Sequence, residues 1–180
     1  RFGCGHLLDL ACGTGFWLPH YVANCVNVTL FDQSERMLME CGLKVGGLGA
    51  ADRCSLVQGD VFDYPFPTWT HDSALVGFLL SHLSEERERL LFQILRQTLR
   101  PNARVLILES AWTELRAKFN DKAGVQLRRL NDGTEFHIYK RYISRQDIAA
   151  WEATHALTPR IEHFGQGLCA VSVSLATGAP

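Results

Sequence analysis

The sequence predicts an α/β protein built on a mostly parallel sheet. Apolar runs typical of strands alternate with amphipathic runs typical of helices along most of the chain. The strand-like runs are almost continuously apolar, as expected where helices cover both faces of a sheet. No repeat, low-complexity segment or linker divides the 180 residues, so we expect a single domain over residues 1–180.

Strands and helices are expected to alternate through the first 110 residues. The clearest helix follows Ser84, because acidic residues fill its first turn, an apolar stripe runs along it and Pro101 lies beyond its end. Shorter helices are expected over Phe16–Asn24 and from Ser34 to residue 45. The strands are expected at His6–Leu10, Val26–Phe31, Ser55–Gln58, Ser73–Phe78 and Arg104–Glu109.

The remainder of the chain follows a different pattern. A helix is predicted over residues 111–126, "AWTELRAKFNDKAGVQ". Residues 127–142, "LRRLNDGTEFHIYKRY", are expected to form a hairpin around Asp132 and Gly133, because Asp-Gly favours a tight turn. A capped helix should begin after Ser144. The last two strands are expected at Arg160–Phe164 and Leu168–Ala176.

Charge and hydropathy argue against several kinds of partner. The formal net charge of −1 gives no electrostatic footprint for nucleic acid or an acidic membrane surface, so neither is expected as a partner. No apolar run approaches the roughly 18 residues that a membrane-spanning helix needs.

The cysteines are expected to be buried, reduced thiols. None forms a Cys-x-x-Cys pair, and no histidine lies at metal-ligand spacing from two of them, so no metal site is expected. They fall in apolar segments, where a free cysteine packs as a small hydrophobe, and this implies a reducing, cytoplasmic location. The cysteines are Cys4, Cys12, Cys25, Cys41, Cys54 and Cys169.

The stretch "LLDLACGTGFW", residues 7–17, places an acid in the first strand and a glycine turn directly after that strand. In open parallel sheets, ligands bind at the carboxyl ends of the strands, where such a turn lies. A Walker phosphate loop is excluded because no lysine follows Gly15 closely. The dinucleotide fingerprint fits poorly because Leu18 stands where its third glycine would allow close packing of helix on strand.

These residues resemble the first motif of the class I S-adenosylmethionine-dependent methyltransferases. Further motifs of that family follow in order: "VTLFDQSERML", "LVQGDVFDYPF", "HDSALVGFLLSHL" and "LRPNARVLILES". The resemblance covers nearly the whole chain. It implies a Rossmann-like, seven-stranded, mostly parallel sheet with helices on both faces and an antiparallel last strand.

The resemblance implies that the chain binds S-adenosylmethionine and releases S-adenosylhomocysteine. Asp32 would accept hydrogen bonds from both ribose hydroxyls, Asp60 and the Val61 N–H would recognise the adenine, and Asp9 would lie near the ammonium group. Small residues in the turn would let the main chain approach the methionine portion. The implied cofactor-binding residues are Asp9, Ala11, Cys12, Gly13, Gly15, Asp32, Gln33, Met37, Asp60, Val61, Gly77 and Phe78.

Structural alternatives exist for several of these residues. Asp32 could serve only as the N-cap of the helix that begins near Ser34, and Asp60 could form an Asx turn. Met37 could equally pack in the core. The order of the motifs after three successive strands favours ligand binding.

His82 is the candidate catalytic residue. It lies in "GFLLSHLSEER", after the fourth strand, where a histidine could act as a general base. The alternative is a histidine that packs beside the cofactor or caps the following helix. The hairpin and the segment before it could line an acceptor pocket, although an exposed face is favoured; the residues concerned are Trp112, Arg128, Arg129, His137 and Tyr139.

The sequence therefore predicts methyl transfer to a small molecule, at oxygen or nitrogen, with carbon also open. The alternatives are a non-catalytic S-adenosylmethionine-binding module and, less favoured, an NAD(P)-dependent reductase. Only "RFGCG" precedes the first strand, so the helices that usually cover the cofactor are expected to be missing from the N-terminus. A second copy of the chain or another partner could then close the cleft.

Overall fold

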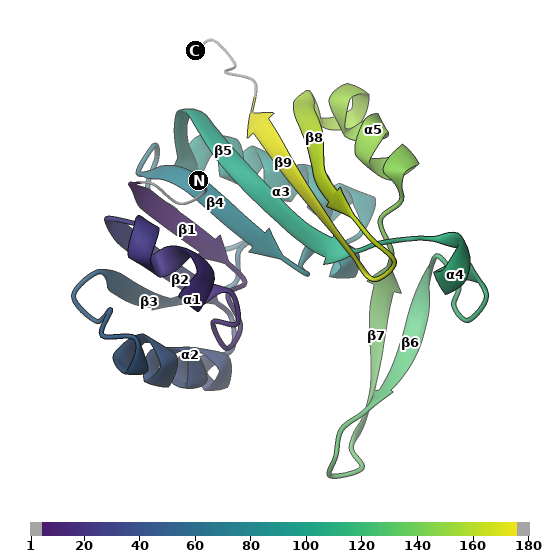
Figure 1. Ribbon diagram of the computed structural model, residues 1–180, viewed down its shortest axis with the longest axis horizontal. Helices are drawn as coiled ribbons and strands as arrows, with labels where there is room; N and C mark the ends of the chain where they lie inside the picture. Colours follow the sequence, from purple (N-terminus) through teal and green to yellow (C-terminus); the bar gives the residue numbers. More distant parts are fainter. Residues whose placement is uncertain (1–4, 176–180) are drawn as a thin grey trace.

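A seven-stranded sheet with the order β3-β2-β1-β4-β5-β9-β8 forms the centre of the computed structural model, which describes residues 5–175 (Figure 1). Neighbouring strands from β3 to β5 run parallel, whereas β9 is antiparallel to both β5 and β8. This arrangement confirms the predicted sheet and its antiparallel last strand. The strands are β1 (His6–Leu10), β2 (Asn27–Asp32), β3 (Cys54–Gln58), β4 (His71–Gly77), β5 (Leu99–Ser110), β8 (Leu157–Phe164) and β9 (Leu168–Leu175).

The three longest helices begin at serines that the sequence indicates. Ser34, Ser84 and Ser144 each accept a hydrogen bond from a backbone N–H of the first turn, and Ser144 forms a capping box with Asp147. The helices are α1 (Leu18–Tyr21), η1 (Val22–Asn24), α2 (Glu35–Gly47), η2 (Leu80–His82), α3 (Glu85–Thr98), α4 (Glu114–Ala117) and α5 (Arg145–His155).

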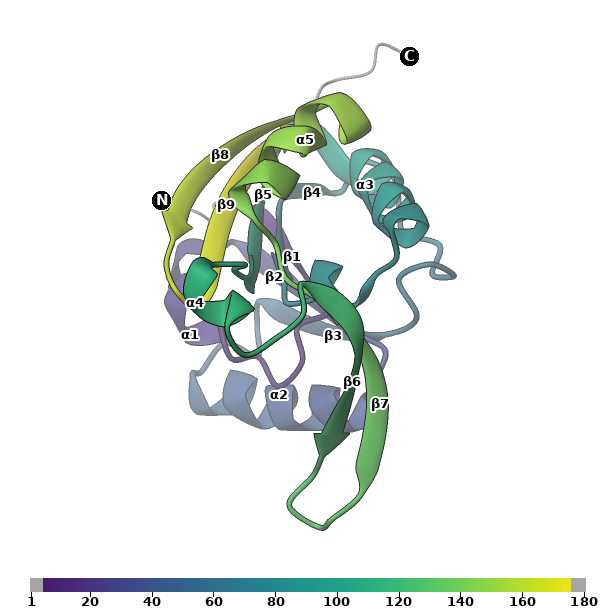
Figure 2. The ribbon, with the colours of Figure 1, turned by 90° about the vertical axis from the view of Figure 1, so that its right-hand side faces the viewer.

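Helices cover both faces of the sheet, and each face has its own core (Figure 2). Alternate residues of one strand point to opposite faces, so Leu8 packs in the core under α3 and α5 while Leu7 packs in the core under α1 and α2. The central strands β1 and β4 are therefore buried on both sides, which explains why they are apolar without alternation, whereas the edge strands β3 and β8 keep exposed positions.

The helix predicted over residues 111–126 is wrong for most of its length. Only α4 (Glu114–Ala117) is helical, and strand β6 (Ala123–Arg129) occupies the end of the segment. β6 pairs antiparallel with β7 (Glu135–Arg141), so the hairpin begins earlier than predicted, although its turn contains Gly133 as expected. Pairing with β7 outweighs a local helical pattern that Gly124 already weakens.

The β6–β7 hairpin extends away from the seven-stranded sheet in both views (Figures 1 and 2). Its base stays attached to the body through the pairing of Ala111 with Ile143. Two predicted positions, Cys4 and Ala176, lie outside the described residues.

Between residues 5 and 175, none of the cysteines forms a disulfide. Within the same range, every helix is too short or too polar to span a lipid bilayer.

Replacing Phe92 by alanine should lower the free energy of unfolding by about 3–5 kcal/mol, because its fully buried ring fills the space against Trp151 and His155. The control is Leu90→Ala on the same helix, where the side chain is 40% exposed and the loss should stay below about 1 kcal/mol. Urea unfolding followed by circular dichroism measures both, and equal losses would contradict the assigned packing.

Candidate active site

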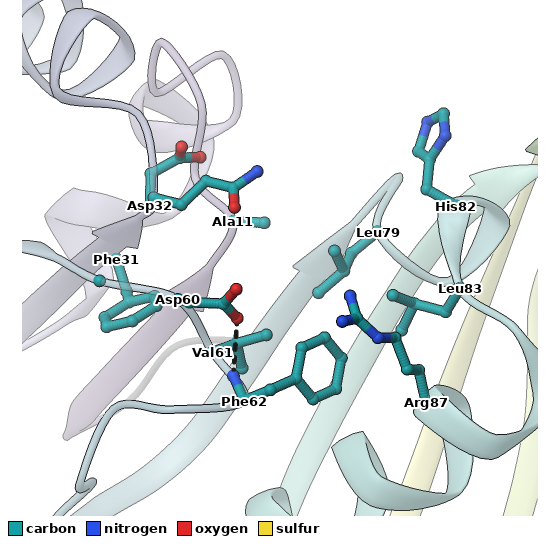
Figure 3. A pocket seen from close by; sticks show the side chains of 12 residues that line it. Ala11, Phe31, Asp32, Asp60, Val61, Phe62, Leu79, His82, Leu83 and Arg87 are labelled. Atoms are coloured by element: carbon teal, nitrogen blue, oxygen red, sulfur yellow. Dashed lines mark hydrogen bonds between the residues drawn. The ribbon is translucent and has the colours of Figure 1, made fainter. Parts of the chain in front are cut away.

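A cleft of about 220 Å³ opens where β1, β2 and β3 end (Figure 3). Asp32 and Asp60 stand on one side of it, and Leu79, Arg87 and His82 stand on the other. This is the edge of the sheet at which the sequence predicts ligand binding. The cleft is lined by Ala11, Phe31, Asp32, Gln33, Gly59, Asp60, Val61, Phe62, Leu79, His82, Leu83 and Arg87.

The turn after β1 follows a backbone path that favours residues with small side chains. Ala11, Gly13 and Gly15 all have positive φ angles, of 59°, 56° and 67°. A Cβ atom at Gly15 would lie 2.7 Å from the Sγ atom of Cys41 in α2, so a larger residue would push the turn away from that helix. The main chain of the turn therefore borders the cleft with few side chains between them.

Asp32 ties this turn to the start of α2. Its Oδ2 atom accepts a hydrogen bond from the Gly13 N–H at 2.8 Å, and its Oδ1 atom accepts one from the Ser34 N–H at 2.9 Å. Ser34, rather than Asp32, caps the helix by accepting from the Met37 N–H. The proposed N-cap role of Asp32 is therefore wrong, and its buried carboxylate is oriented at the cleft wall by two main-chain donors.

Asp60 forms the Asx turn that was the structural alternative. Its Oδ1 atom accepts a hydrogen bond from the Phe62 N–H at 2.9 Å, and its carboxylate still points into the cleft (Figure 3). The preceding Gly59 is required by close packing, since a Cβ atom there would lie 2.9 Å from Tyr64 and 3.0 Å from Phe31. Asp60 can therefore form the Asx turn and face a ligand in the cleft at the same time.

Asp9 is buried in β1 and does not line the cleft. Its Oδ2 atom accepts a hydrogen bond from the Tyr21 hydroxyl of α1. Burial raises the pKa of Asp9 from its usual 3.8 to about 7, although the hydrogen bond from Tyr21 opposes this rise and the negative charge of Asp32 adds to it. A cation bound nearby would favour the ionised form.

Other predicted cofactor-binding residues surround the cleft without lining it. Met37 is in the first turn of α2 and is 41% exposed, so the alternative that placed it in the core is wrong. Gly77 ends β4, and Phe78 follows with a φ of 55°. Cys12, Gly13 and Gly15 belong to the turn described above.

His82 ends η2 on the far side of the cleft from the two aspartates (Figure 3). Its Nδ1 atom lies 2.9 Å from the carbonyl oxygen of Tyr139 in the hairpin. Ser84 caps α3, so the capping role considered for His82 is wrong. The side chain is exposed at the rim of the cleft.

The hairpin residues singled out in the sequence do not line the cleft. Arg129 forms an exposed ion pair with Glu135, and Trp112 stacks on Tyr142 with ring centres 5.9 Å apart. Six further residues line the cleft without having been predicted from the sequence. Five of them, Phe31, Gly59, Phe62, Leu79 and Leu83, adjoin predicted positions in the sequence, and this adjacency is the signal that could have indicated them. The sixth, Arg87, lies in the first turn of α3 and has no such signal.

Replacing Asp9 by asparagine should stabilise the ligand-free protein above neutral pH. Wild-type Asp9 is neutral in the folded chain below about pH 7 but ionised in the unfolded chain above about pH 4, so its contribution to stability falls between these values as pH rises. The variant should therefore gain about 2–4 kcal/mol at pH 8, less at pH 5 and nothing below pH 4. Urea unfolding at each pH measures this difference. A constant difference between pH 4 and 8 would contradict the raised pKa.

Comparisons with known proteins agree with this fold and with the position of the motifs. A family model described as a methyltransferase domain matches residues 7–102, more than half of the chain. The chain is 36% identical over 109 residues to a demethylmenaquinone methyltransferase of Lactiplantibacillus plantarum, covering 59% of this chain and 45% of the relative. It is 32% identical over 106 residues to a ubiquinone/menaquinone biosynthesis C-methyltransferase of Paracoccus denitrificans, covering 58% and 42%. The chain thus spans less than half the length of these relatives.

Solved structures share the fold at lower identity. A structure described as a DhpI–SAH complex superposes with a TM-score of 0.80 at 23% identity, covering 97% of this chain and 78% of that one. A 1,6-didemethyltoxoflavin-N1-methyltransferase of Burkholderia thailandensis gives a TM-score of 0.69 at 16% identity, covering 94% and 70%. Together with the family match over more than half of its length, the ordered motifs and the sheet topology, this means that the chain belongs to the class I S-adenosylmethionine-dependent methyltransferase family.

Proposed function

We propose that the chain binds S-adenosylmethionine and transfers its methyl group to a small-molecule acceptor, releasing S-adenosylhomocysteine. The observation that carries this proposal is the convergence of the Asp32 and Asp60 carboxylates on one cleft beside the glycine turn. Family membership supports it, since the matched region contains the turn and both carboxylates.

The hydrogen-bonding groups of the cleft fit an adenosine. A carboxylate offers about four acceptor positions, and the N–H groups of Gly13 and Ser34 occupy two of those on Asp32. The remaining positions can accept both hydroxyls of a ribose. Asp60 keeps one oxygen for an exocyclic amino group, while the Val61 N–H can donate to a ring nitrogen. Apolar contact from Phe31 and Phe62 suits a flat purine.

The methionine portion would extend from the adenosine toward the glycine turn and the end of β4. Ala11 and Gly13 present main chain there, and the carbonyl oxygens of Gly77 and Phe78 are suitable acceptors for an ammonium group. Asp9 lies beneath the turn, where the ionised carboxylate would attract the same ammonium group.

Bound S-adenosylmethionine supplies an electrophilic methyl group on a sulfonium, which becomes a neutral thioether on transfer. The chain mainly needs to hold the acceptor in line and exclude water, and such positioning can lower a barrier by several kcal/mol. Where the acceptor atom carries a proton, we propose His82 as the general base, because its side chain borders the cleft opposite the cofactor aspartates.

The acceptor is proposed as a small molecule with an oxygen, nitrogen or carbon centre. The curated relatives are named as quinone methyltransferases, one of them as a C-methyltransferase, which supports carbon among these. The loop after β4 reads "GFLL" and lacks the Asn/Asp-Pro-Pro-Tyr/Phe signature of amide methylation, which argues against base-amino and glutamine acceptors.

We also propose that the protein works in the cytoplasm. Cys12, Cys41 and Cys169 are buried and contribute to the packing of the cores as thiols, which suits a reducing compartment.

Asp32→Ala should weaken the binding of S-adenosylmethionine by about 1–3 kcal/mol, or roughly 5-fold to 150-fold in Kd, because hydrogen bonds to a charged acceptor are lost. Isothermal titration calorimetry measures the change. Asp63→Ala is the matched control: it removes an exposed carboxylate on the same loop as Asp60 and should leave Kd within about twofold.

The same titration separates this function from its rivals. Wild-type protein should bind S-adenosylmethionine and S-adenosylhomocysteine but not NADH. Binding of NADH alone would reject the proposal in favour of a reductase. Cofactor binding without turnover against diverse acceptors would favour a non-catalytic module.

His82→Ala should lower kcat by roughly 10²-fold to 10⁴-fold for an acceptor that loses a proton, since a general base contributes about that factor. Transfer of a labelled methyl group measures the rate, and cofactor Kd should change little. His163→Ala, on β8 and away from the cleft, serves as the control. A normal rate for His82→Ala would show that positioning alone drives the reaction.

A further inference from the structure

Strand β7 of the hairpin lies along η2, the segment that carries His82. Three consecutive residues of β7 contact three consecutive residues of η2, in opposite chain directions. The contacts are Tyr139 O to His82 Nδ1 at 2.9 Å, Lys140 Nζ to Ser81 Oγ at 2.6 Å and Arg141 Nε to Leu80 O at 3.2 Å. We refer to these three contacts as the β7–η2 clasp.

The clasp decides which nitrogen of His82 carries a proton. A carbonyl oxygen can only accept a hydrogen bond, so the Nδ1 atom facing Tyr139 must be the donor. In the neutral imidazole the Nε2 atom then holds the lone pair. A general base needs that lone pair, and His82 lines the cleft in which the acceptor would bind.

Lys140 anchors the middle of the clasp from a buried position. It is only 7% exposed, and its Nζ atom lies 6.0 Å from the ring centre of Phe78 and 5.9 Å from that of Tyr142. Its neighbour in sequence, Tyr139, is 41% exposed. A lysine is rarely buried without a specific polar partner, because desolvation of the ammonium group is costly.

Ser81, the residue that Lys140 contacts, is also buried, and it forms a hydrogen bond with a second buried charged residue. Glu109 at the end of β5 is fully buried, and its Oε1 atom accepts a hydrogen bond from the Ser81 N–H at 3.0 Å. Its Oε2 atom accepts from the Ser110 N–H at 3.2 Å. Ser81 is thus held from the sheet by Glu109 and from the hairpin by Lys140.

The placement of charge agrees with this arrangement. Burial lowers the pKa of Lys140 and raises the pKa of Glu109, while the attraction between the two groups opposes both shifts. An apolar side chain at position 140 would fill the same space without desolvating a charge, but it would not bond to Ser81. The polar contact therefore specifies the register of β7 on η2.

We propose that Lys140 is a positioning residue for methyl transfer. By holding Ser81 it keeps β7 in register with η2, so that the Tyr139 carbonyl fixes the proton of His82 on Nδ1 and leaves Nε2 as the proton acceptor. This inference rests on the proposed role of His82 as a base and assigns the hairpin a part in that role.

Each proton and electron pair in the proposed methyl transfer has a defined destination. As the acceptor atom forms its bond to the methyl carbon, the carbon–sulfur bond breaks and its electron pair goes to sulfur. The Nε2 atom takes the proton that the acceptor atom loses. The resulting imidazolium still donates from Nδ1 to the Tyr139 carbonyl, and Nε2 later returns its proton to solvent.

The direct test is the tautomer of His82 in the full chain, read by ¹⁵N–¹H multiple-bond NMR at a pH where the ring is neutral. His82→Ala assigns the signals. The wild type should show the Nδ1–H tautomer as the main form. Lys140→Met should convert it to a mixture in which Nε2–H is substantially populated.

Kinetics on the same proteins test the consequence. Lys140→Met should lower kcat roughly 10-fold to 100-fold, less than removal of the base itself, with cofactor Kd within about twofold. Ser81→Ala should have a similar effect. The double variant should be no worse than the more severe single one, because both remove the same contact. Ser81→Ala also keeps the test decisive if Lys140→Met fails to fold.

The matched control is Lys122→Met. Lys122 bonds to Asp147 at 2.8 Å and to Ser144, so it ties the hairpin base to the start of α5 rather than to η2. It should alter neither the tautomer nor kcat.

Two results would overturn the inference: an Nε2–H tautomer in the wild type, or an unchanged Nδ1–H tautomer in both Lys140→Met and Ser81→Ala. Because the NMR measurement needs no turnover, it stands apart from the proposed function. A normal rate for His82→Ala would reject His82 as the general base. The tautomer of His82 in the Lys140→Met protein would still show whether Lys140 maintains the clasp.

Discussion

The pair of main-chain hydrogen bonds to Asp32 is the constraint on which the cleft depends. One comes from the turn after β1 and the other from the segment that leads into α2, so a single carboxylate fixes two loops relative to each other. Parallel pairing of β1 with β2 brings both loops to the same edge of the sheet. The carboxylate keeps further acceptor positions, and a single residue can therefore both shape the cleft and bind a ligand in it.

The two sides of the cleft have different origins. The aspartate side is built from short loops that directly follow β1, β2 and β3, and its geometry is local. The His82 side depends on a hairpin, because the carbonyl of Tyr139, 57 residues further along the chain, contacts His82. It also depends on the buried side chains of Lys140 and Glu109, which hold Ser81 beside it. The aspartate side is thus fixed by the sheet, whereas the His82 side is fixed by a contact between distant segments.

This difference explains what the sequence could predict. The strands of the sheet and the serine caps are encoded by patterns within a few residues. Each strand overlaps its predicted range, although β5 begins at Leu99 rather than Arg104 and β8 begins at Leu157 rather than Arg160. The first arm of the hairpin was mistaken for helix because its pairing with β7 is not visible locally. The hydrogen bond between Lys140 and Ser81 joins residues 59 positions apart. No sequence motif around either residue indicates this contact or the burial of Lys140. Arg87 was missed for the same reason, since only the folded cleft brings its helix face opposite Asp60.

The most direct measurement is a crystal structure of the chain with S-adenosylhomocysteine. We expect the ribose hydroxyls within hydrogen-bond distance of Asp32, the adenine amino group beside Asp60 and the sulfur directed toward the His82 side of the cleft. A cleft that stays empty under saturating S-adenosylhomocysteine, or that instead takes up a pyridine nucleotide, would contradict the account.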